Sequence, residues 1–356
     1  MDMHPSIVKI LVPATIAFVI GILSTPIVTH YLYKYRVWKK VGGKLALDGS
    51  TANEFNRLHG DGETKTPRMG GIVIWGSVLI TTIGIALLAN IFPASPIAHF
   101  SFLTRNETWI PFFTLIIGAM VGLLNDLLDV SVDGKGLTLK ARLLIVVILS
   151  GFIGWWFYAK LAVVAIDIPF AQPLTIGWLI IPLFILVSLC LYASGVIDGI
   201  DGLSGGIFTS VFASYTIIAF AESEFELAAF CATLVGALLA FLWFNIPPAR
   251  FYMSETGTMG ITLTIASVAF LTDNLGQGIG IAVLPIIGAL LLATVVSNIL
   301  QLVWKRLFGK KLFRIAPLHH HFEAIGWPGS KVVMRYWILS IMFSFAGVIL
   351  ALSVLR

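Results

Sequence analysis

Long apolar runs, each close to the length that crosses a membrane, alternate with polar segments along this 356-residue chain. A hydrocarbon core about 30 Å thick takes about 20 helical residues to cross. The runs are apolar on every face, whereas the strands of a membrane barrel alternate apolar and polar positions. We therefore predict an all-α polytopic membrane protein with about ten transmembrane helices. The predicted spans are 7–32, 70–92, 108–124, 142–159, 176–197, 204–221, 227–244, 258–272, 277–303 and 333–355.

Two of these spans are unusual in length. The span at 258–272 is short, and the span at 277–303 is long enough to tilt or bend. The first run begins after His4 and is too long for a cleavable signal, which predicts a retained helix. No internal repeat or separate soluble domain is evident, so we interpret residues 1–356 as a single integral membrane domain.

Composition agrees with a membrane location. Hydrophobic residues make up 58% of the chain and charged residues 12%, about half the charged fraction of a soluble domain. Cys190 and Cys231 both lie inside apolar runs, which favours buried small hydrophobic residues over a disulfide or a metal site.

The basic residues predict the orientation of the spans. Of the 23 Lys and Arg residues, 19 fall at the odd-numbered loops, most of them in the first and ninth. The four others are Lys9, Arg105, Lys160 and Arg356. Because cytoplasmic loops are enriched in Lys and Arg, the odd loops are predicted to be cytoplasmic and both termini to lie outside.

A histidine run lies in a basic interval between the last two apolar runs. It reads Ala316-Pro317-Leu318-His319-His320-His321-Phe322-Glu323, and Gly326-Trp327-Pro328 follows. Three consecutive histidines cannot share one face of a helix or strand, so they suit a loop or helix end that converges on a ligand. Imidazole donates to phosphate or changes charge near neutral pH. The alternatives are a solvated turn or an engineered tag, and about 20 apolar residues after the run argue against a tag.

Acidic residues end the third span. Asp126 and Asp129 follow Asn125 at positions that share one face of a helix. Acids at a helix C-terminus oppose its dipole, so they need a cation, a metal or water. Lys140 and Arg142 open the next span and offer charge for a bound phosphate. The alternative is an ordinary solvated loop.

A second acidic pair lies in a glycine-rich break after the fifth span. Asp198 and Asp201 stand within the stretch 194–206, which contains five glycines. Carboxylates at membrane depth are costly and are functional by default. Their oxygens suit Mg²⁺ or hydrogen bonding to a hydroxylated ligand.

Three other cytoplasmic segments carry candidate ligand-binding groups. The turn at 65–71 combines a proline with paired glycines, although an interfacial turn with snorkelling basic residues is equally consistent. The seventh loop places Asn245, Arg250 and Glu255 among aromatic residues. Its Tyr252 suits either an aromatic belt or stacking on a flat base. Gln301 is an amide near the cytoplasmic end of the ninth span, where amides are uncommon.

With these segments in place, the chain resembles the phospho-N-acetylmuramoyl-pentapeptide transferase family, the MraY translocases. That family belongs to the polyprenyl-phosphate N-acetylhexosamine-1-phosphate transferase superfamily. The resemblance covers nearly the whole chain, and its most specific part is 316–323 with 326–328 and 332–338. The segments 198–202 and 66–71 also match, but the wider superfamily shares them wholly or in part, so the histidine run discriminates the family.

The resemblance implies a Mg²⁺-dependent transfer of phospho-MurNAc-pentapeptide from UDP-MurNAc-pentapeptide to undecaprenyl phosphate, which yields lipid I and UMP for peptidoglycan synthesis. It implies a multi-pass protein of the bacterial cytoplasmic (inner) membrane with its active site on the cytoplasmic side. The expected partners are the two substrates and membrane lipid, with no nucleic acid. A homodimer is an assembly that the resemblance allows.

The resemblance also assigns residues by position. The catalytic positions it implies are Asn125, Asp126, Asp198, Asp201, His319, His320 and His321. The substrate-binding positions are Lys65, Lys140, Arg142, Asn245, Tyr252 and Gln301, and Glu255 is the implied metal ligand.

This sequence departs from the family pattern at three places. Asn125 stands where the family has an aspartate; its oxygen can ligate, but the amide cannot act as a base. Glu255 replaces an aspartate and adds a methylene of reach. Around Ser194-Gly195 the family's asparagine is missing. Together these departures indicate a divergent member with an altered sugar-peptide.

Two other functions compete with this interpretation. One is a sister enzyme that transfers GlcNAc-1-phosphate or a related sugar, and the triple histidine followed by Phe322-Glu323 argues against it. The other is a transporter with an intramembrane ion pathway. That class would place acids near the middle of a span, whereas here they cluster at the cytoplasmic ends.

Overall fold

The computed structural model describes residues 3–40, 64–104, 106–131, 134, 136–274 and 278–355. The helices that begin in the first half of the chain are α1 (Met3–Lys34), α3 (Gly71–Ile91), α4 (Asn106–Val130) and α5 (Leu139–Ala159). The others are α6 (Ile180–Ser194), α7 (Leu203–Ala221), α8 (Phe225–Asn245), α9 (Ser254–Asn274), α10 (Gly280–Ile287), α11 (Ala289–Phe308), α12 (Leu318–Ala324) and α13 (Gly329–Val354).

Little else is regular in the described part of the chain. Two-residue strands, β1 (Ala165–Ile166) and β2 (Leu174–Thr175), pair antiparallel in the loop between α5 and α6. Three 3-10 turns, η1 (Pro96–Phe100), η2 (Gly177–Leu179) and η3 (Gly195–Ile197), complete the elements. The predicted all-α membrane architecture is confirmed.

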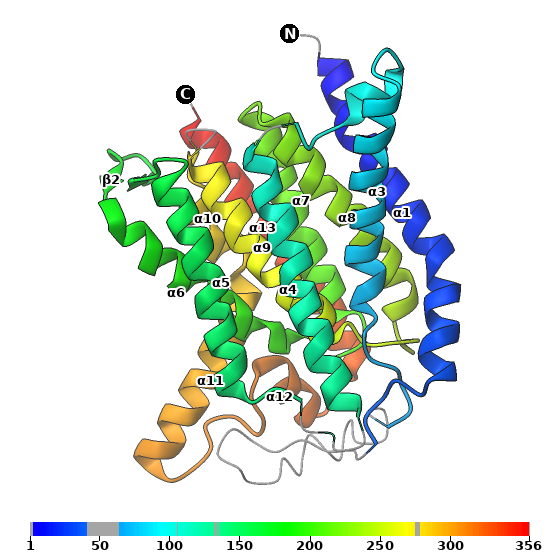
Figure 1. Ribbon diagram of the computed structural model, residues 1–356. Helices are drawn as coiled ribbons and strands as arrows, with labels where there is room; N and C mark the ends of the chain where they lie inside the picture. The colour runs from blue at the N-terminus through cyan, green and yellow to red at the C-terminus, as the bar shows by residue number, and fades with distance from the viewer. Residues whose placement is uncertain are drawn as a thin grey trace.

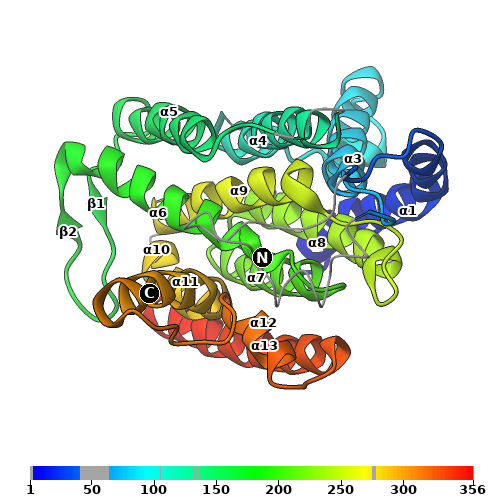
Figure 2. The same cartoon turned by 90° about the horizontal axis from the view of Figure 1, so that it is seen from below.

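Among the described residues, nine helices are long and apolar enough to cross a membrane. Helix α9 is not one of them, although it corresponds to the short span predicted at 258–272 and runs for 21 residues. Figure 2 shows α9 in the middle of the bundle, between α4 and α8. Its polar side chains are buried there, and Thr262 and Thr264 donate to carbonyls of their own helix, at 2.7 Å each. Because protein rather than lipid surrounds it, α9 does not need an apolar surface.

The span predicted at 277–303 is broken rather than continuous. Helix α10 ends at Ile287, and α11 begins at Ala289 after Gly288, whose backbone is not helical. Pro285 lies within α10 and cannot donate a backbone hydrogen bond, which favours a break nearby. In Figure 1, α11 runs at a slant away from the bundle, toward the end where α12 lies.

Glycines let α9 pack unusually close to two neighbours. A Cβ built on Gly122 of α4 would lie 1.9 Å from the carbonyl oxygen of Glu255, and one on Gly118 would lie 2.8 Å from Cα of Gly260. A Cβ on Gly71 of α3 would lie 2.3 Å from the amide nitrogen of Gly257. Small residues allow such backbone contact between membrane helices. The start of α9 is therefore held against the C-terminal half of α4 and the start of α3.

The start of α1 and the end of α13 lie at one end of the bundle, and the end of α1, the start of α3 and α12 lie at the other (Figure 1). Because α1 begins and α13 ends at the same end of the bundle, the structure agrees with an even number of spans. Several basic residues counted above to predict orientation lie outside the described residues: Lys44, Arg57, Arg105, Lys135 and Arg356.

The contact between α4 and α9 can be tested with Gly122→Ala. Its new methyl would meet the backbone of Glu255, so we expect a loss of about 1–3 kcal/mol of stability. The measurement is the thermal unfolding midpoint of the purified protein in detergent. Gly84→Ala is the matched control, because a Cβ at Gly84 meets nothing within 4 Å. Equal midpoints for the two variants would contradict close packing at Gly122.

Candidate active site

The start of α9 binds two carboxylates from other parts of the chain. Asp126 Oδ2, at the end of α4, accepts hydrogen bonds from the Thr256 amide at 2.8 Å and the Thr256 hydroxyl at 2.6 Å. Asp198 Oδ2 accepts from the Ser254 amide at 2.8 Å. The first amides of a helix have no partner within it and carry a partial positive charge, so they stabilise carboxylates. Two acids predicted from separate motifs thus meet at one helix end.

Glu255 lies in the first turn of the same helix and holds two partners. Its Oε1 forms an ion pair with Nη1 of Arg142, near the start of α5. The Tyr192 hydroxyl on α6 lies 3.4 Å from Oε1 and 3.3 Å from Oε2. Arg142 and Glu255 were both predicted as site residues, whereas Tyr192 was missed. A lone tyrosine within an apolar span gives no sequence signal.

Asp129, one helical turn after Asp126, faces a different partner. Its carboxylate forms an ion pair with Arg68, whose Nε also donates to Ser254 Oγ at 3.4 Å. The shared helix face expected for Asp126 and Asp129 therefore serves two contacts, one to α9 and one to the turn at 65–71. Arg68 and Asp129 stood in noted motifs but were not predicted as site residues.

The turn at 65–71 is attached to the loop that precedes α9. The Tyr252 amide donates to the Pro67 carbonyl, and the Gly70 amide donates to the Tyr252 carbonyl, both at 2.8 Å. The side chain of Lys65 is exposed beside this turn. Lys65 and Tyr252 thus lie in adjoining segments, and their substrate-binding roles stay predictions.

The side chain of Asn245 connects two loops through hydrogen bonds. Its Oδ1 accepts from the Gly202 amide at 3.0 Å, and its Nδ2 donates to the Phe251 carbonyl at 2.9 Å. The residue is only 1% exposed. Its predicted substrate-binding role stays a prediction, and its observed hydrogen bonds support the turn that carries Asp198 and Asp201.

That turn has its own hydrogen bonds. Asp198 Oδ1 accepts from the Ser204 hydroxyl at 2.7 Å, and Asp201 Oδ2 accepts from the Ala249 amide at 2.9 Å. Gly202 has φ +80°, a conformation that favours glycine. Both predicted acids are therefore oriented by backbone and hydroxyl donors.

The histidine run forms the short helix α12 and packs on the same turn. A Cβ at Gly199 would lie 2.5 Å from His320 Nε2 and 3.1 Å from His319 Nε2, so only glycine fits between the acids and the histidines. His319 and His320 are buried, and His320 Nδ1 lies 2.8 Å from Glu323 Oε2. As expected, the three rings do not share a face, and His321 is directed to a different partner.

His321 accepts a hydrogen bond at Nδ1 from the Arg314 amide at 3.2 Å. Partial burial and the nearby Arg314 guanidinium lower the pKa of His321 below its usual 6.5. Its imidazole is therefore neutral at pH 7, which agrees with its role as an acceptor in this hydrogen bond.

The remaining predicted residues lie around this centre. Asn125 Oδ1 accepts from the Leu137 amide at 2.9 Å and so ties α4 to the segment before α5. Gln301 bonds the backbone of Leu312 and Phe313 through both ends of its amide and supports the loop that leads to α12. Lys140 is exposed at the start of α5.

The carboxylates of Asp126 and Glu255, which lie at the start of α9, are suitable ligands for a magnesium ion. Within the described residues, Asp126 Oδ1 is buried and has no hydrogen-bond partner. No three His, Cys, Asp or Glu side chains of this described part converge as a ready metal cluster. Magnesium at phosphate sites commonly uses only one or two carboxylates, with water and phosphate oxygens as the other ligands. Asp126 and Glu255 therefore suit such an ion.

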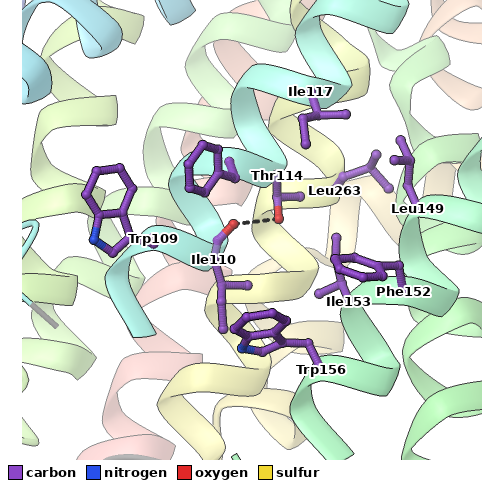
Figure 3. Close-up of a pocket in the computed structure, with 10 residues that line it drawn as sticks. Trp109, Ile110, Thr114, Ile117, Leu149, Phe152, Ile153, Trp156 and Leu263 are labelled. Carbon is purple, nitrogen blue, oxygen red and sulfur yellow. Dashed lines mark hydrogen bonds between the residues drawn. The ribbon is translucent and has the colours of Figure 1, made fainter. Parts of the chain in front are cut away.

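An apolar cavity of about 270 Å³ lies elsewhere on α4 and α5, beside α9 (Figure 3). Trp109, Phe152, Trp156 and Leu263 are among its lining residues. The hydroxyl of Thr114, also in the lining, donates to the Ile110 carbonyl at 2.7 Å. None of the lining residues is ionisable, so this cavity offers no group for phosphate chemistry, and the acid cluster is the candidate active site.

Known proteins match this chain over nearly its whole length. Residues 108–273 match the family model described as glycosyl transferase family 4, a range that includes all the predicted acids. The chain is 30% identical over 344 residues to a protein of Clostridium perfringens (strain SM101 / Type A), an alignment that covers 95% of each chain. A protein of Bacillus mycoides (strain KBAB4) is 31% identical over 347 residues, which cover 95% of this chain and 97% of that one. Both proteins are named phospho-N-acetylmuramoyl-pentapeptide-transferase.

Proposed function

Because this chain belongs to the phospho-N-acetylmuramoyl-pentapeptide-transferase family, we propose that it makes lipid I for peptidoglycan synthesis. It would transfer phospho-MurNAc-pentapeptide from UDP-MurNAc-pentapeptide to undecaprenyl phosphate and release UMP. The convergence of Asp126, Asp198 and Glu255 on the start of α9, next to the histidines of α12, supports this proposal. The whole chain, residues 1–356, would act as one membrane domain.

The reaction brings two anions together, and this requirement governs the site. An oxygen of the lipid phosphate attacks the sugar-side phosphorus of the donor diphosphate, and UMP leaves. Phosphoryl transfer depends mainly on positioning and on stabilising negative charge. Arg142, Arg68 and the exposed Lys65 and Lys140 provide positive charge at this end of the bundle.

The acids would orient the reactants and hold the metal. Asp126 and Glu255 would ligate Mg²⁺, which supplies a Lewis acid that neutralises the diphosphate. Asp198 and Asp201, fixed by Ser204, Ser254 and Ala249, would hold polar groups of the substrates. The buried histidines lie against Gly199 and would donate to phosphate or sugar oxygens.

The attacking phosphate does not need a strong base. The second pKa of a phosphate monoester is near ~6, so the acceptor is already mostly deprotonated at neutral pH. This explains how Asn125 is compatible with activity: its amide carries no exchangeable acid-base function, but its oxygen holds the Leu137 amide.

The sister reaction, transfer of GlcNAc-1-phosphate or a related sugar, is the second candidate. The departures from the family pattern at Asn125 and Glu255 are the observation that favours it, because both residues lie in the proposed catalytic and metal-binding cluster. Transport is a remote alternative, since the acids lie at helix ends and are hydrogen-bonded to protein groups.

A donor assay tests the proposal. We expect purified protein with undecaprenyl phosphate and Mg²⁺ to release UMP from UDP-MurNAc-pentapeptide and far less from UDP-GlcNAc. Glu255→Gln should reduce the rate by at least about a hundredfold through weaker charge stabilisation. Asp167→Asn is a control in the loop between α5 and α6 and should keep the wild-type rate. Faster release from UDP-GlcNAc would identify the sister enzyme, and no release from either donor would refute both.

A second comparison separates Asp126 from its neighbour. We expect Asp126→Asn to lose about 10²–10⁴-fold in transfer rate, the range of an essential acid-base or charged group. Asn125→Ala loses one hydrogen bond, so the loss should stay within about tenfold, and Asn125→Asp should retain activity. The measurement is the initial rate of lipid I formation. A silent Asp126→Asn beside an inactive Asn125→Ala would reverse the assignment.

Orientation follows from the same proposal. A cytoplasmic nucleotide donor requires α12 and the start of α9 to face the cytoplasm of a bacterial inner membrane, with both termini outside. In intact cells, a membrane-impermeant maleimide should label Gln172→Cys, in the loop between α5 and α6, and should not label Lys311→Cys. Cys190→Ser/Cys231→Ser provides the background for both variants. The opposite labelling pattern would place the site on the wrong side for the donor.

A further inference from the structure

Glu255, the carboxylate proposed to bind a metal ion, is already paired with a positively charged side chain of the protein. Arg142 Nη1 binds Glu255 Oε1, and the Tyr192 hydroxyl lies within hydrogen-bond distance of both carboxylate oxygens. The side chains of Arg142 and Glu255 are only 26% and 19% exposed. A guanidinium and a divalent cation at the same carboxylate oxygen repel each other, so they compete for Glu255 Oε1.

Arg142 supplies the positive charge next to the Glu255 carboxylate in this structure. Among the described residues, the ion pair of Glu255 is with Arg142. Arg68 is itself paired with Asp129. Removing Arg142 without a substitute would leave a largely buried carboxylate uncompensated, which is unfavourable.

One of the hydrogen-bond donors of the Arg142 guanidinium has no partner in this arrangement. Within the described residues, Arg142 Nε is buried and has no hydrogen-bond partner. A diphosphate offers the planar guanidinium two oxygens at once, a stronger arrangement than an ion pair through Nη1 alone. An incoming diphosphate would therefore draw Arg142 away from the carboxylate, and a metal ion could then take its place.

We propose that Arg142 is an electrostatic gate: it occupies Glu255 in the free protein and releases it when a nucleoside diphosphate binds, so that divalent cation and donor bind cooperatively. This inference rests on the proposed function, which makes Glu255 a metal ligand. Tyr192 keeps the carboxylate oriented during the exchange. Because coupling is reciprocal, cation and nucleotide raise each other's affinity by the same factor.

The gate predicts that removing the guanidinium strengthens cation binding to the free protein. The probe is Mn²⁺, a hard cation that uses the same oxygen ligands as Mg²⁺ and whose free fraction is measured by electron paramagnetic resonance. We expect Arg142→Gln to bind Mn²⁺ about tenfold tighter than wild type, within the usual range of coupling between sites. Lys160→Gln removes the same charge at the far end of α5 and should match wild type. Adding Glu255→Gln to Arg142→Gln should abolish the gain.

Cooperativity is measured with UDP, after subtraction of the Mn²⁺–UDP complex formed without protein. UDP should raise the Mn²⁺ affinity of wild type by a larger factor than that of Arg142→Gln, whose site is already open. Arg142→Met is a second neutral variant with an apolar stem, for use if Arg142→Gln does not fold. The UDP effect on wild type needs no variant at all.

The outcomes separate the gate from the function on which it rests. Unchanged Mn²⁺ affinity in both neutral Arg142 variants, with binding still lost in Glu255→Gln, would overturn the gate and leave Glu255 as the metal ligand. Wild-type Mn²⁺ binding in Glu255→Gln would overturn the gate together with the metal role of Glu255. Neither outcome decides which donor is used, since UMP release measures that independently.

Discussion

The backbone amides at the start of α9 have no partner within their own helix, and the site depends on how they are satisfied. This helix begins with buried residues, among them Ser254 and Thr256, and buried amides without partners are costly. Asp126 supplies an acceptor from α4, and Asp198 supplies one from the turn after α6. The need to satisfy one helix end therefore places acids from distant segments beside Glu255, and the candidate chemistry follows from that placement.

Close packing makes this arrangement specific. The contacts of Gly122, Gly118 and Gly71 with the backbone of α9 leave no room for a side chain. A hydrogen bond of 2.8 Å between Asp126 and the Thr256 amide requires α4 and α9 to lie this close. At the other side of the site, Gly199 lets α12 approach the acidic turn in the same way. Packing and polar contacts thus support each other, as buried networks in membrane proteins require.

Charge balance is the second property of the site. Arg68 and Arg142 neutralise Asp129 and Glu255 before any substrate is present. A site that binds a diphosphate, a lipid phosphate and a metal ion has to exchange such internal pairs for external ones. The exposed Lys65 and Lys140 lie in segments next to these pairs and can meet incoming anions. Arg142, the half-buried arginine paired with Glu255, is therefore the position where binding and conformational change are most directly linked.

Much of the architecture was determined by the sequence itself, because crossing a membrane depends on the length and apolarity of a continuous segment. The spans, the acids at their ends and the histidine run were all identifiable from neighbouring residues. Tertiary structure alone decided the partners: Tyr192 on Glu255, Arg68 on Asp129, and Asn245 on two backbone groups. It also decided that α9 is central and that the ninth span breaks at Gly288. A hydrogen bond depends on distances of a few tenths of an ångström between helices, and those distances are set by packing between segments far apart in the chain.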